Sequence, residues 1–450
     1  MKSVALHSLG CKVNRYETDV MGQKLQESGY KIVPFDEKAD VYIINTCSVT
    51  AIADHKSRQM IHRAKRKSPE SVVVACGCYV ETDMENAKLN ESIDIIVGNN
   101  KKSEIVSILD EYFDDIEKEA AKEIDKCLSG GSITDINAPG QQYEKMNLKH
   151  MPGHTRAYIK IQDGCNQFCS YCIIPYARGR IRSREEADII AEVENLAKEG
   201  CSEIVLTGIH VSSYGVDRQG EAELLKLLRA LNDIDGIERI RLSSLEPRII
   251  TKEMAQGMAS LEKLCPHFHL SLQSGSDDTL KRMNRHYTAE EYMESVRLLR
   301  EVYDKPAITT DVIVGFPGET EETYEESRAF CENINFYEMH VFKYSARKGT
   351  VAAKMQDQLT DKEKTRRSGI LLDMTKKQSK AYRESFVGTK EKILWEDYET
   401  INDRQYLIGL TTRYIRVAVL KEEVEEKKAA PGHISENLIK GFLKDDTLII

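Results

Sequence analysis

The chain has 450 residues, 41% of them hydrophobic and 30% charged, which is an ordinary composition for globular domains and leads us to expect two or three of them. Its formal net charge of −9 argues against the uniformly basic surface of a typical nucleic-acid-binding domain. No run of 18 apolar residues occurs, so a membrane-spanning helix is excluded.

The amino-terminal residues contain no apolar core of the length that a signal peptide needs. We therefore expect a cytoplasmic protein without membrane attachment. In such a reducing compartment the 11 cysteines are available for metal binding or catalysis rather than for disulfides.

Residues 1–128 are predicted to form an open parallel α/β sheet domain. Short apolar runs alternate with amphipathic helical stretches, which is the pattern of parallel sheets. The predicted strands are residues 4–6, 41–44, 72–75 and 93–97. Residues 104–128 have a helical, acidic pattern, and residues 129–155 are rich in turn-forming residues and are predicted to be a linker.

A cysteine follows each of the first three predicted strands. Cys11 follows the first, Cys47 the second, and either Cys76 or Cys78 the third. The carboxyl ends of parallel strands open on one edge of the sheet, so we expect three cysteines to converge there. We choose Cys78, because Cys76 ends the strand and should pack inward, whereas Gly77 lets the chain turn toward the edge.

Residues 156–384 are predicted to form an incomplete (βα)6 barrel, with its active site at the carboxyl ends of the strands. The predicted strands are residues 157–161, 203–207, 239–243, 267–272, 308–314 and 336–344. A second open doubly wound sheet is the alternative. A long helix then leads to residues 385–450, where short β-type runs predict a small all-β domain.

The loop after the first predicted barrel strand contains Cys165, Cys169 and Cys172, in the spacing C-x3-C-x2-C. Thiolates suit zinc and iron–sulfur clusters. A structural zinc site would need a fourth ligand nearby, and no zinc-type CxxC pair accompanies the triplet. Three ligands instead fit a [4Fe–4S] cluster that leaves one iron open to a bound molecule.

The segment "CNQFCSYC", with Tyr171 as its aromatic residue, resembles the radical S-adenosylmethionine motif. "LGCKVNRYE", "INTCSVT" and "GCY", together with "SLQSGSDDTLKRMNRHYTAEEY", "DVIVGFPGET" and "FKYSARKGTVAA", resemble the motifs of the radical S-adenosylmethionine methylthiotransferase family nearly end to end. The final β domain is similar to a TRAM domain, a small RNA-binding barrel.

This resemblance implies two [4Fe–4S] clusters, one held by Cys165, Cys169 and Cys172 and an auxiliary one held by Cys11, Cys47 and Cys78. It also implies two molecules of S-adenosylmethionine per turnover, one donating a methyl group and one cleaved to a 5′-deoxyadenosyl radical. An external electron donor such as a flavodoxin or ferredoxin would supply the electron. The expected partner is tRNA, and the chain is expected to be a monomer.

Members of the family methylthiolate isopentenyladenosine or N6-threonylcarbamoyladenosine next to the tRNA anticodon, or an aspartate of a ribosomal protein. "LTGIHVSSYG", "RIRLSSLEP" and "GFPGETEETY" resemble the threonylcarbamoyl branch most. The other two substrates remain alternatives. From a different class, a metal-dependent RNA-binding protein without redox chemistry is also possible.

Further candidates lie at the predicted strand ends. The residues that could contact S-adenosylmethionine are Tyr171, Thr207, Gly208, Ser243, Gln273 and Gly315. For several of them, ordinary tight turns and helix caps are an equally good explanation. Because a guanidinium can bind a carboxylate through two hydrogen bonds, Arg178 and Arg180 are candidates for the threonylcarbamoyl carboxylate.

Two basic segments, residues 55–67 and 178–184, are candidate RNA contacts or simply solvated surface. In the last domain acidic residues outnumber basic ones, so an RNA-binding face there must be segregated. Its candidate residues are Arg413, Arg416, Lys440 and Lys444.

Overall fold

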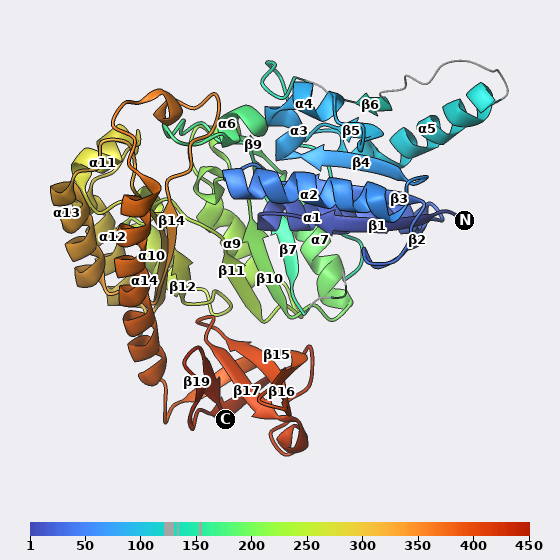
Figure 1. Cartoon of the computed structure of the whole chain (residues 1–450). Helices are drawn as coiled ribbons and strands as arrows, with labels where there is room; N and C mark the ends of the chain where they lie inside the picture. The colour runs from blue at the N-terminus through green and yellow to red at the C-terminus, as the bar shows by residue number, and fades with distance from the viewer. Residues whose placement is uncertain (121–129, 133–134, 152, 154) are drawn as a thin grey trace.

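The computed structural model describes residues 1–120, 130–132, 135–151, 153 and 155–450 (Figure 1). An amino-terminal α/β domain lies against a central partial barrel, and a small β domain lies below the barrel in this view. Among the described residues, no helix combines the length and the apolar character needed to cross a bilayer.

The amino-terminal domain is a six-stranded parallel sheet in the order β2-β1-β3-β4-β5-β6. Its strands are β1 (Ser3–Ser8), β2 (Lys31–Ile32), β3 (Val41–Thr46), β4 (Val72–Gly77), β5 (Ile95–Val97) and β6 (Gly130–Ser132). Its helices are α1 (Lys12–Glu27), α2 (Ala51–Lys67), α3 (Cys78–Thr82), α4 (Met84–Lys88), η1 (Lys102–Glu104) and α5 (Ile105–Ala120). Every residue of β3 and β4 is buried, as expected of parallel strands covered on both faces.

The predicted open parallel sheet is confirmed, with two additions. The edge strands β2 and β6 were not expected, and β6 lies in the segment predicted to be a linker. Both are short and have weak apolar patterns, so pairing with a neighbouring strand decides their conformation. The predicted helix 104–128 is observed as Ile105–Ala120, and the rest of it lies outside the described residues.

The central domain has six parallel strands in two three-stranded sheets, β11-β10-β7 and β12-β13-β14. The strands are β7 (Ala157–Lys160), β10 (Glu203–Thr207), β11 (Arg239–Leu242), β12 (His267–His269), β13 (Ala307–Val314) and β14 (Glu338–Lys343). Isolated parallel bridges, Ile240 to Leu264 and Leu245 to Leu270, join the two sheets into one curved wall.

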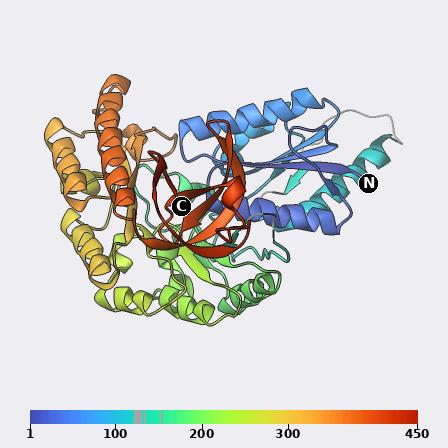
Figure 2. The ribbon, with the colours of Figure 1, turned by 90° about the horizontal axis from the view of Figure 1, so that it is seen from below.

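The main helices of this domain are α7 (Glu186–Lys198), α9 (Leu224–Asn232), α10 (Lys252–Ala259), α12 (Ala289–Val302) and α13 (Glu321–Ile334). They form an arc outside the curved wall (Figure 2). A doubly wound sheet would carry helices on both faces, so the predicted incomplete barrel is confirmed and the doubly wound alternative is wrong.

The open side of the barrel is covered by the amino-terminal domain. Helix α1 packs along β7, at one edge of the curved wall. At the other edge, the loop after β14 meets the start of α2: the amide of Ala51 donates to Ser345 Oγ (3.1 Å), and Arg347 forms an ion pair with Asp54. The amino-terminal domain therefore contacts both edges of the curved wall and closes the open side of the barrel.

Helix α14 (Asp361–Glu384) leads to the carboxyl-terminal β domain, whose sheet has the order β18-β15-β16-β17-β20-β19. The strands are β15 (Lys390–Ile401), β16 (Arg404–Thr411), β17 (Arg416–Leu420), β18 (Ile434–Leu438), β19 (Gly441–Lys444) and β20 (Thr447–Ile449). Trp395 is fully buried in its core. The predicted small all-β domain is confirmed.

The turn between β16 and β17 is inserted against the amino ends of the barrel strands. Arg241 donates to the carbonyls of Thr411 and Thr412 (both 2.7 Å), and the ring of Tyr414 stacks on His267 with the ring centroids 4.9 Å apart. Arg413 donates to the carbonyls of Asp304 and Lys305 (2.9 and 3.0 Å). Arg413 therefore joins two domains in this structure, and its contact with RNA stays a prediction.

Candidate active site

The cysteine triplet lies in the loop after β7, at the carboxyl end of the barrel. A short ribbon of β8 (Gln162–Asp163) and β9 (Arg182–Ser183) closes the base of the loop, and the amide of Cys165 donates to the carbonyl of Gly179 (3.0 Å). Gly164 has φ +71°, and a Cβ there would lie 1.8 Å from the carbonyl oxygen of Arg180. Glycine at this position lets the two sides of the loop close tightly.

The three thiols of this loop are close enough to act on one another. Burial raises the pKa of Cys165 to about 11 and that of Cys172 to about 12, and the charge of Cys169 raises both further. Clustered buried thiols of this kind become thiolates only when positive charge compensates them. The three thiols therefore fit an iron–sulfur cluster, which Cys165, Cys169 and Cys172 would hold.

Arg285 is a functional candidate that sequence analysis missed. Its guanidinium Nη1 lies 3.3 Å from Cys169 Sγ, and Nη2 lies 3.4 Å from the carbonyl oxygen of Ser271. A cation beside a thiolate ligand stabilises the negative charge. Arg285 lies 113 positions after Cys172 in the chain, and nothing in its local sequence pattern indicates this contact.

The second set of cysteines converges at the carboxyl edge of the amino-terminal sheet. Cys11 precedes α1, Cys47 follows β3, and Cys78 begins α3. A Cβ on Gly10, which has φ +89°, would lie 2.5 Å from Cys47 Sγ, so the first and second cysteine loops touch. Burial raises the pKa of Cys47 to about 12, with Cys78 and Cys11 adding to the effect.

Cys76 lies elsewhere. It is fully buried in the core, and its thiol points to the carbonyl oxygen of Ile44 (3.6 Å). The structure thus brings Cys11, Cys47 and Cys78 together and leaves Cys76 in the interior of the sheet. Three thiols close together are suitable ligands for an iron–sulfur cluster, as in the loop after β7. Cys11, Cys47 and Cys78 therefore fit a second cluster.

Helix α6 (Ile174–Ala177) connects the two cysteine sets. It begins two residues after Cys172 and packs against α3, which begins with Cys78. Asn99 Nδ2 donates to the carbonyl of Ala177 (2.7 Å) and fixes this contact. The packing of two short helices therefore places both sets at the junction of the two domains.

Arg178, at the end of α6, does not have the predicted substrate-binding role. Its side chain is fully buried, with Nη1 2.9 Å from Glu17 and Nη2 2.6 Å from Asn14 Oδ1. It also lies beside Cys78, where its charge opposes the rise in the thiol pKa that burial causes. No surface of Arg178 remains for a substrate, and its position suits stabilisation of the auxiliary thiolates.

Arg178 belongs to a buried network of charges between α1 and β7. Glu17 accepts hydrogen bonds from Lys102 (2.5 Å), Lys160 (2.7 Å) and Arg178, and Asp163 pairs with Lys160 (2.6 Å) and Arg178 (3.1 Å). Three cations thus surround two carboxylates. Two of these cations, Arg178 and Lys102, act on Cys78 and lower its pKa against the effect of burial, so they complement an anionic sulfur ligand.

Replacing Glu17 with glutamine is expected to lower the free energy of unfolding by about 3–5 kcal/mol, because it leaves buried cations without their counter-charge. Thermal unfolding of the iron-loaded protein measures this effect. Glu27→Gln on the same helix is the control, because its ion pair with Lys149 is largely exposed and should contribute less than about 1 kcal/mol. If the two variants had equal free energies of unfolding, the buried charge network around Glu17 would not stabilise the protein as described.

The predicted S-adenosylmethionine contacts surround the carboxyl end of the barrel. Ser243 has a buried Oγ without a hydrogen-bond partner, and Gln273 adopts φ +70°, a strained conformation for a residue with a side chain. Tyr171 packs edge-on against Phe316, with the ring centroids 6.4 Å apart. Thr207 is buried at the end of β10. These features fit a ligand-binding mouth.

The two glycines of this set are required by close contacts. A Cβ on Gly208 would lie 2.9 Å from Gln162 Oε1, and one on Gly315 would lie 2.3 Å from Lys364 Cγ. Gly208 and Gly315 therefore have structural reasons to be glycine, whether or not they also approach the cofactor.

His210 and Glu246 are two further groups at the mouth that sequence analysis did not single out. His210 Nε2 is buried without a hydrogen-bond partner and lies 4.0 Å from Glu246 Oε2. Burial lowers the pKa of His210 to about 4, so the ring is neutral at pH 7. An unpaired imidazole nitrogen at this place is available to a ligand.

The remaining basic candidates have mixed surroundings. Arg180 is exposed, and its guanidinium stacks over Phe168 in the cysteine loop, 4.6 Å from the ring centroid. Arg416 pairs with Glu399 (2.5 Å). In the basic segment of α2, Arg63 pairs with Asp36 and Lys65 with Asp94 (2.5 and 2.8 Å). Arg180 thus keeps an exposed cation close to the cluster loop.

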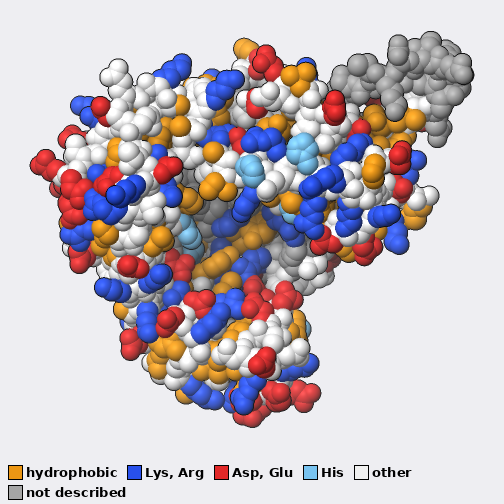
Figure 3. Space-filling model, in the orientation of Figure 1, with side chains coloured by type: hydrophobic (Ala, Val, Ile, Leu, Met, Phe, Trp, Pro, Cys, Tyr) orange, Lys and Arg blue, Asp and Glu red, His pale blue; other side chains and the backbone are white. Residues whose placement is uncertain are grey.

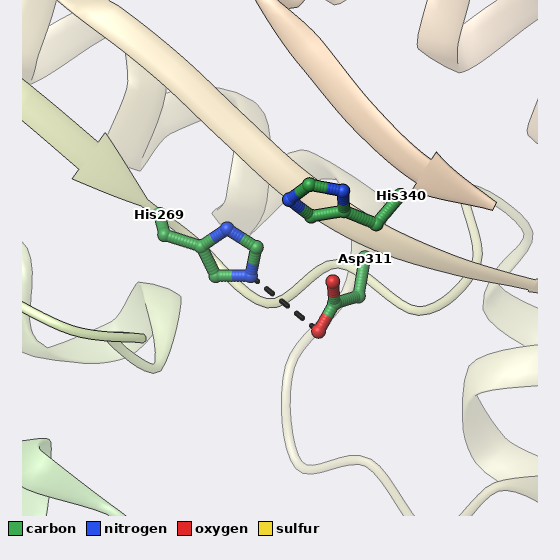
Figure 4. Close-up of side chains that lie close together, drawn as sticks. All are labelled: His269, Asp311 and His340. Carbon is green, nitrogen blue, oxygen red and sulfur yellow. Dashed lines mark ion pairs between the residues drawn. The ribbon is translucent and has the colours of Figure 1, made fainter. Parts of the chain in front are cut away.

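Between the three domains the surface is hollowed, and basic and hydrophobic side chains line the hollow (Figure 3). Lys12 is the first residue of α1. The enclosure and the nearby charges of Arg241 and Arg156 lower the pKa of Lys12 to about 8. In the barrel domain, His269, Asp311 and His340 come from three adjacent strands and lie close together (Figure 4).

Two family models match the chain. Residues 159–331 match the Radical SAM superfamily, and residues 3–98 match the uncharacterized protein family UPF0004. The two cysteine sets lie one in each matched segment. The described fold is therefore consistent with both matches.

Curated proteins match over most of their length. The threonylcarbamoyladenosine tRNA methylthiotransferase MtaB of Bacillus subtilis is 38% identical over 419 residues, which cover 93% of this chain and 90% of that protein. The tRNA-2-methylthio-N(6)-dimethylallyladenosine synthase of Carboxydothermus hydrogenoformans is 35% identical over 406 residues, covering 87% and 89%.

Among solved structures, the radical S-adenosylmethionine methyltransferase TsrM of Kitasatospora setae superposes with a TM-score of 0.54. The sequences are 18% identical, and the match covers 78% of this chain and 77% of that one. This similarity concerns the fold alone.

Proposed function

Since the chain belongs to the radical S-adenosylmethionine methylthiotransferase family, we propose that it methylthiolates C2 of the adenine in N6-threonylcarbamoyladenosine, at position 37 of tRNA, next to the anticodon. We propose further that it uses two [4Fe–4S] clusters. The observation that supports the proposal is that two separate three-cysteine sets lie at the junction of the two domains, where α3, which begins with Cys78, packs against α6, which follows Cys172.

The chain's own residues divide into two groups. Cys165, Cys169 and Cys172 would hold the cluster that binds and reductively cleaves S-adenosylmethionine, whereas Cys11, Cys47 and Cys78 would hold the one that carries sulfur. When bound, these groups supply the electron and the sulfur atom that no side chain can provide.

Protein side chains would position the reactants. Arg285 balances the charge of Cys169, and Arg178 does the same for Cys78. Ser243, Gln273 and His210 offer polar groups at the barrel mouth. A tRNA closing the hollow would exclude water from the reaction, with its target base flipped into the hollow.

The choice of threonylcarbamoyladenosine is supported by the Bacillus subtilis relative and by the polar walls of the hollow. Isopentenyladenosine is the principal alternative, because a relative named for the dimethylallyl nucleoside is 35% identical. An apolar isopentenyl group would face Lys12, Asp311 and His340 without forming hydrogen bonds. The aspartate of a ribosomal protein remains the third candidate.

The proposed partners are tRNA and a small reductant protein such as a flavodoxin or ferredoxin. Exposed Arg180 and the exposed basic residues of α2 are suited to phosphate contacts. The carboxyl-terminal domain, similar in sequence to a TRAM domain, would hold the tRNA from below. We propose a monomer.

Mass spectrometry of nucleosides from a strain lacking this gene tests the function. The methylthio form of N6-threonylcarbamoyladenosine should disappear and the unmethylthiolated nucleoside should accumulate, and the gene supplied in trans should restore the product. Loss of methylthiolated isopentenyladenosine instead, or a mass change in the ribosomal protein, would assign the enzyme to another branch. Unchanged nucleosides and protein would favour a non-redox RNA-binding protein.

A further inference from the structure

His269, Asp311 and His340 form a polar group on the inner wall of the barrel. They lie on adjacent strands β12, β13 and β14, and Asp311 and His340 are direct partners in the sheet register. One polar atom from each of the three side chains lies within 4.8 Å of the other two, and the side chains face one another across the strands (Figure 4).

The orientation of this group follows from strand alternation. Phe268, Val312 and Met339, which neighbour the three residues in sequence, are buried in the core under the outer helices. His269, Asp311 and His340 therefore point to the opposite face, into the hollow. Their exposure agrees, because His340 is exposed and the Asp311 side chain is 31% exposed.

The two histidines of this group differ in their hydrogen bonding. His269 Nδ1 lies 3.0 Å from Thr309 Oγ1, and its Nε2 lies 3.4 Å from Asp311 Oδ2, so the ring is held in one orientation. His340 stacks on His269 with the ring centroids 5.8 Å apart. Among the described residues, no hydrogen bond or ion pair occupies the nitrogens of His340.

Lys12 lies in the same region of the molecule as this group. Lys12, His269 and His340 are all near the buried ring of His267, and each contributes to lowering the pKa of that ring. Lys12 also has no ion-pair or hydrogen-bond partner among the described residues, whereas the neighbouring Arg241 is fully engaged by Glu203 and two carbonyls. Lys12 therefore brings an unpaired positive charge to a region that also contains the Asp311 carboxylate.

The chemistry of this region matches an anionic substituent with hydrogen-bond donors of its own. A threonylcarbamoyl group carries a carboxylate, a hydroxyl and urea N–H groups. Lys12 and His340 can bind the carboxylate, and Asp311 can accept from an N–H or O–H. An isopentenyl group satisfies none of these, and a site built to bind polar groups rejects analogues that lack them.

We propose that Lys12, Asp311 and His340 are the specificity-determining residues for the threonylcarbamoyl group, with His269 positioning Asp311. The inference rests on the proposed function and deepens it. His269, Asp311 and His340 could also ligate a divalent transition metal. We favour the substrate because the two imidazoles stack nearly face to face, with 27° between their planes, whereas shared ligation needs both rings to aim a nitrogen at one point.

The test measures RNA binding by the iron-loaded enzyme under anaerobic conditions. Anticodon stem-loops carry N6-threonylcarbamoyladenosine, its neutral carboxamide analogue, or unmodified adenosine. The wild-type enzyme should prefer the carboxylate to the carboxamide by roughly 10- to 150-fold, the range of a hydrogen bond to a charged group. In His340→Leu and Lys12→Met this preference should fall to less than about threefold. Binding of the unmodified stem-loop should not change.

Two further variants complete the design. His340→Gln, which retains a hydrogen-bond donor, should recover part of the preference. His286→Leu removes an exposed histidine of the loop after α11 (Asp277–Arg282) and should keep the wild-type preference. Iron content identical to wild type identifies variants that are folded and loaded. If His340→Leu does not fold, His340→Gln replaces it in the comparison with the wild-type enzyme.

The outcomes separate the inference from the proposed function. If wild type fails to methylthiolate threonylcarbamoyladenosine in tRNA, the proposed function fails and the inference with it. If wild type modifies this nucleoside and prefers the carboxylate, but both variants keep the preference, only the inference is overturned. One equivalent of zinc, manganese or other non-cluster metal that is lost in His340→Leu would also overturn it in favour of a metal site.

Discussion

Cys165→Ala is expected to abolish reductive cleavage of S-adenosylmethionine. Cys165 is one of three thiols in a single tight loop, and two remaining thiolates would leave a cluster with two open corners. Loss of a ligand should exceed the about 10–100-fold effect typical of changing a residue that only orients a ligand. The measurement is 5′-deoxyadenosine formed in the presence of dithionite, quantified by mass spectrometry.

Cys331→Ala is the matched control for this loss. Cys331 is also fully buried in the barrel domain, but it lies in α13 on the outer face, within the hydrophobic core. The Cys331→Ala substitution should destabilise the protein modestly and leave the cleavage of S-adenosylmethionine intact. Substantial 5′-deoxyadenosine from Cys165→Ala would contradict the assignment of the triplet as the site of cleavage.

Cys47→Ala is expected to separate the two halves of the reaction. The variant should still form 5′-deoxyadenosine, because the triplet lies in another domain, but it should transfer no methylthio group to tRNA. Its iron content should fall by roughly half relative to wild type if the amino-terminal set holds one of two [4Fe–4S] clusters. Mass spectrometry of the nucleosides measures the product.

Cys76→Ala is the control within the same sheet. Cys76 lies in β4, two residues before Cys78, yet its thiol faces Ile44 in the core. The Cys76→Ala variant should retain sulfur insertion and lose only packing energy. Cys78→Ala should behave like Cys47→Ala. If Cys76→Ala stopped insertion and Cys78→Ala did not, the ligand set would be Cys11, Cys47 and Cys76.

The cysteine pattern and the alternation of strands and helices are properties of the sequence itself. Local periodicity decides whether a segment becomes a strand or a helix, and cysteines placed after parallel strands must gather at one edge. For this reason the parallel sheet, the partial barrel and the small β domain could all be predicted, as could candidate ligand sets. The exceptions were β2 and β6, because two- and three-residue edge strands have almost no pattern of their own.

The roles of charged residues were decided only by the tertiary structure. Arg178 and Arg413 have the local sequence of exposed cations, yet one is enclosed by Glu17 and Asp163 and the other caps a domain contact. Likewise, His269, Asp311 and His340 come from separate strands, and Arg285 meets Cys169 across the barrel mouth. A charge acquires its function from partners that are distant in the chain, and only folding brings those partners within a few ångströms.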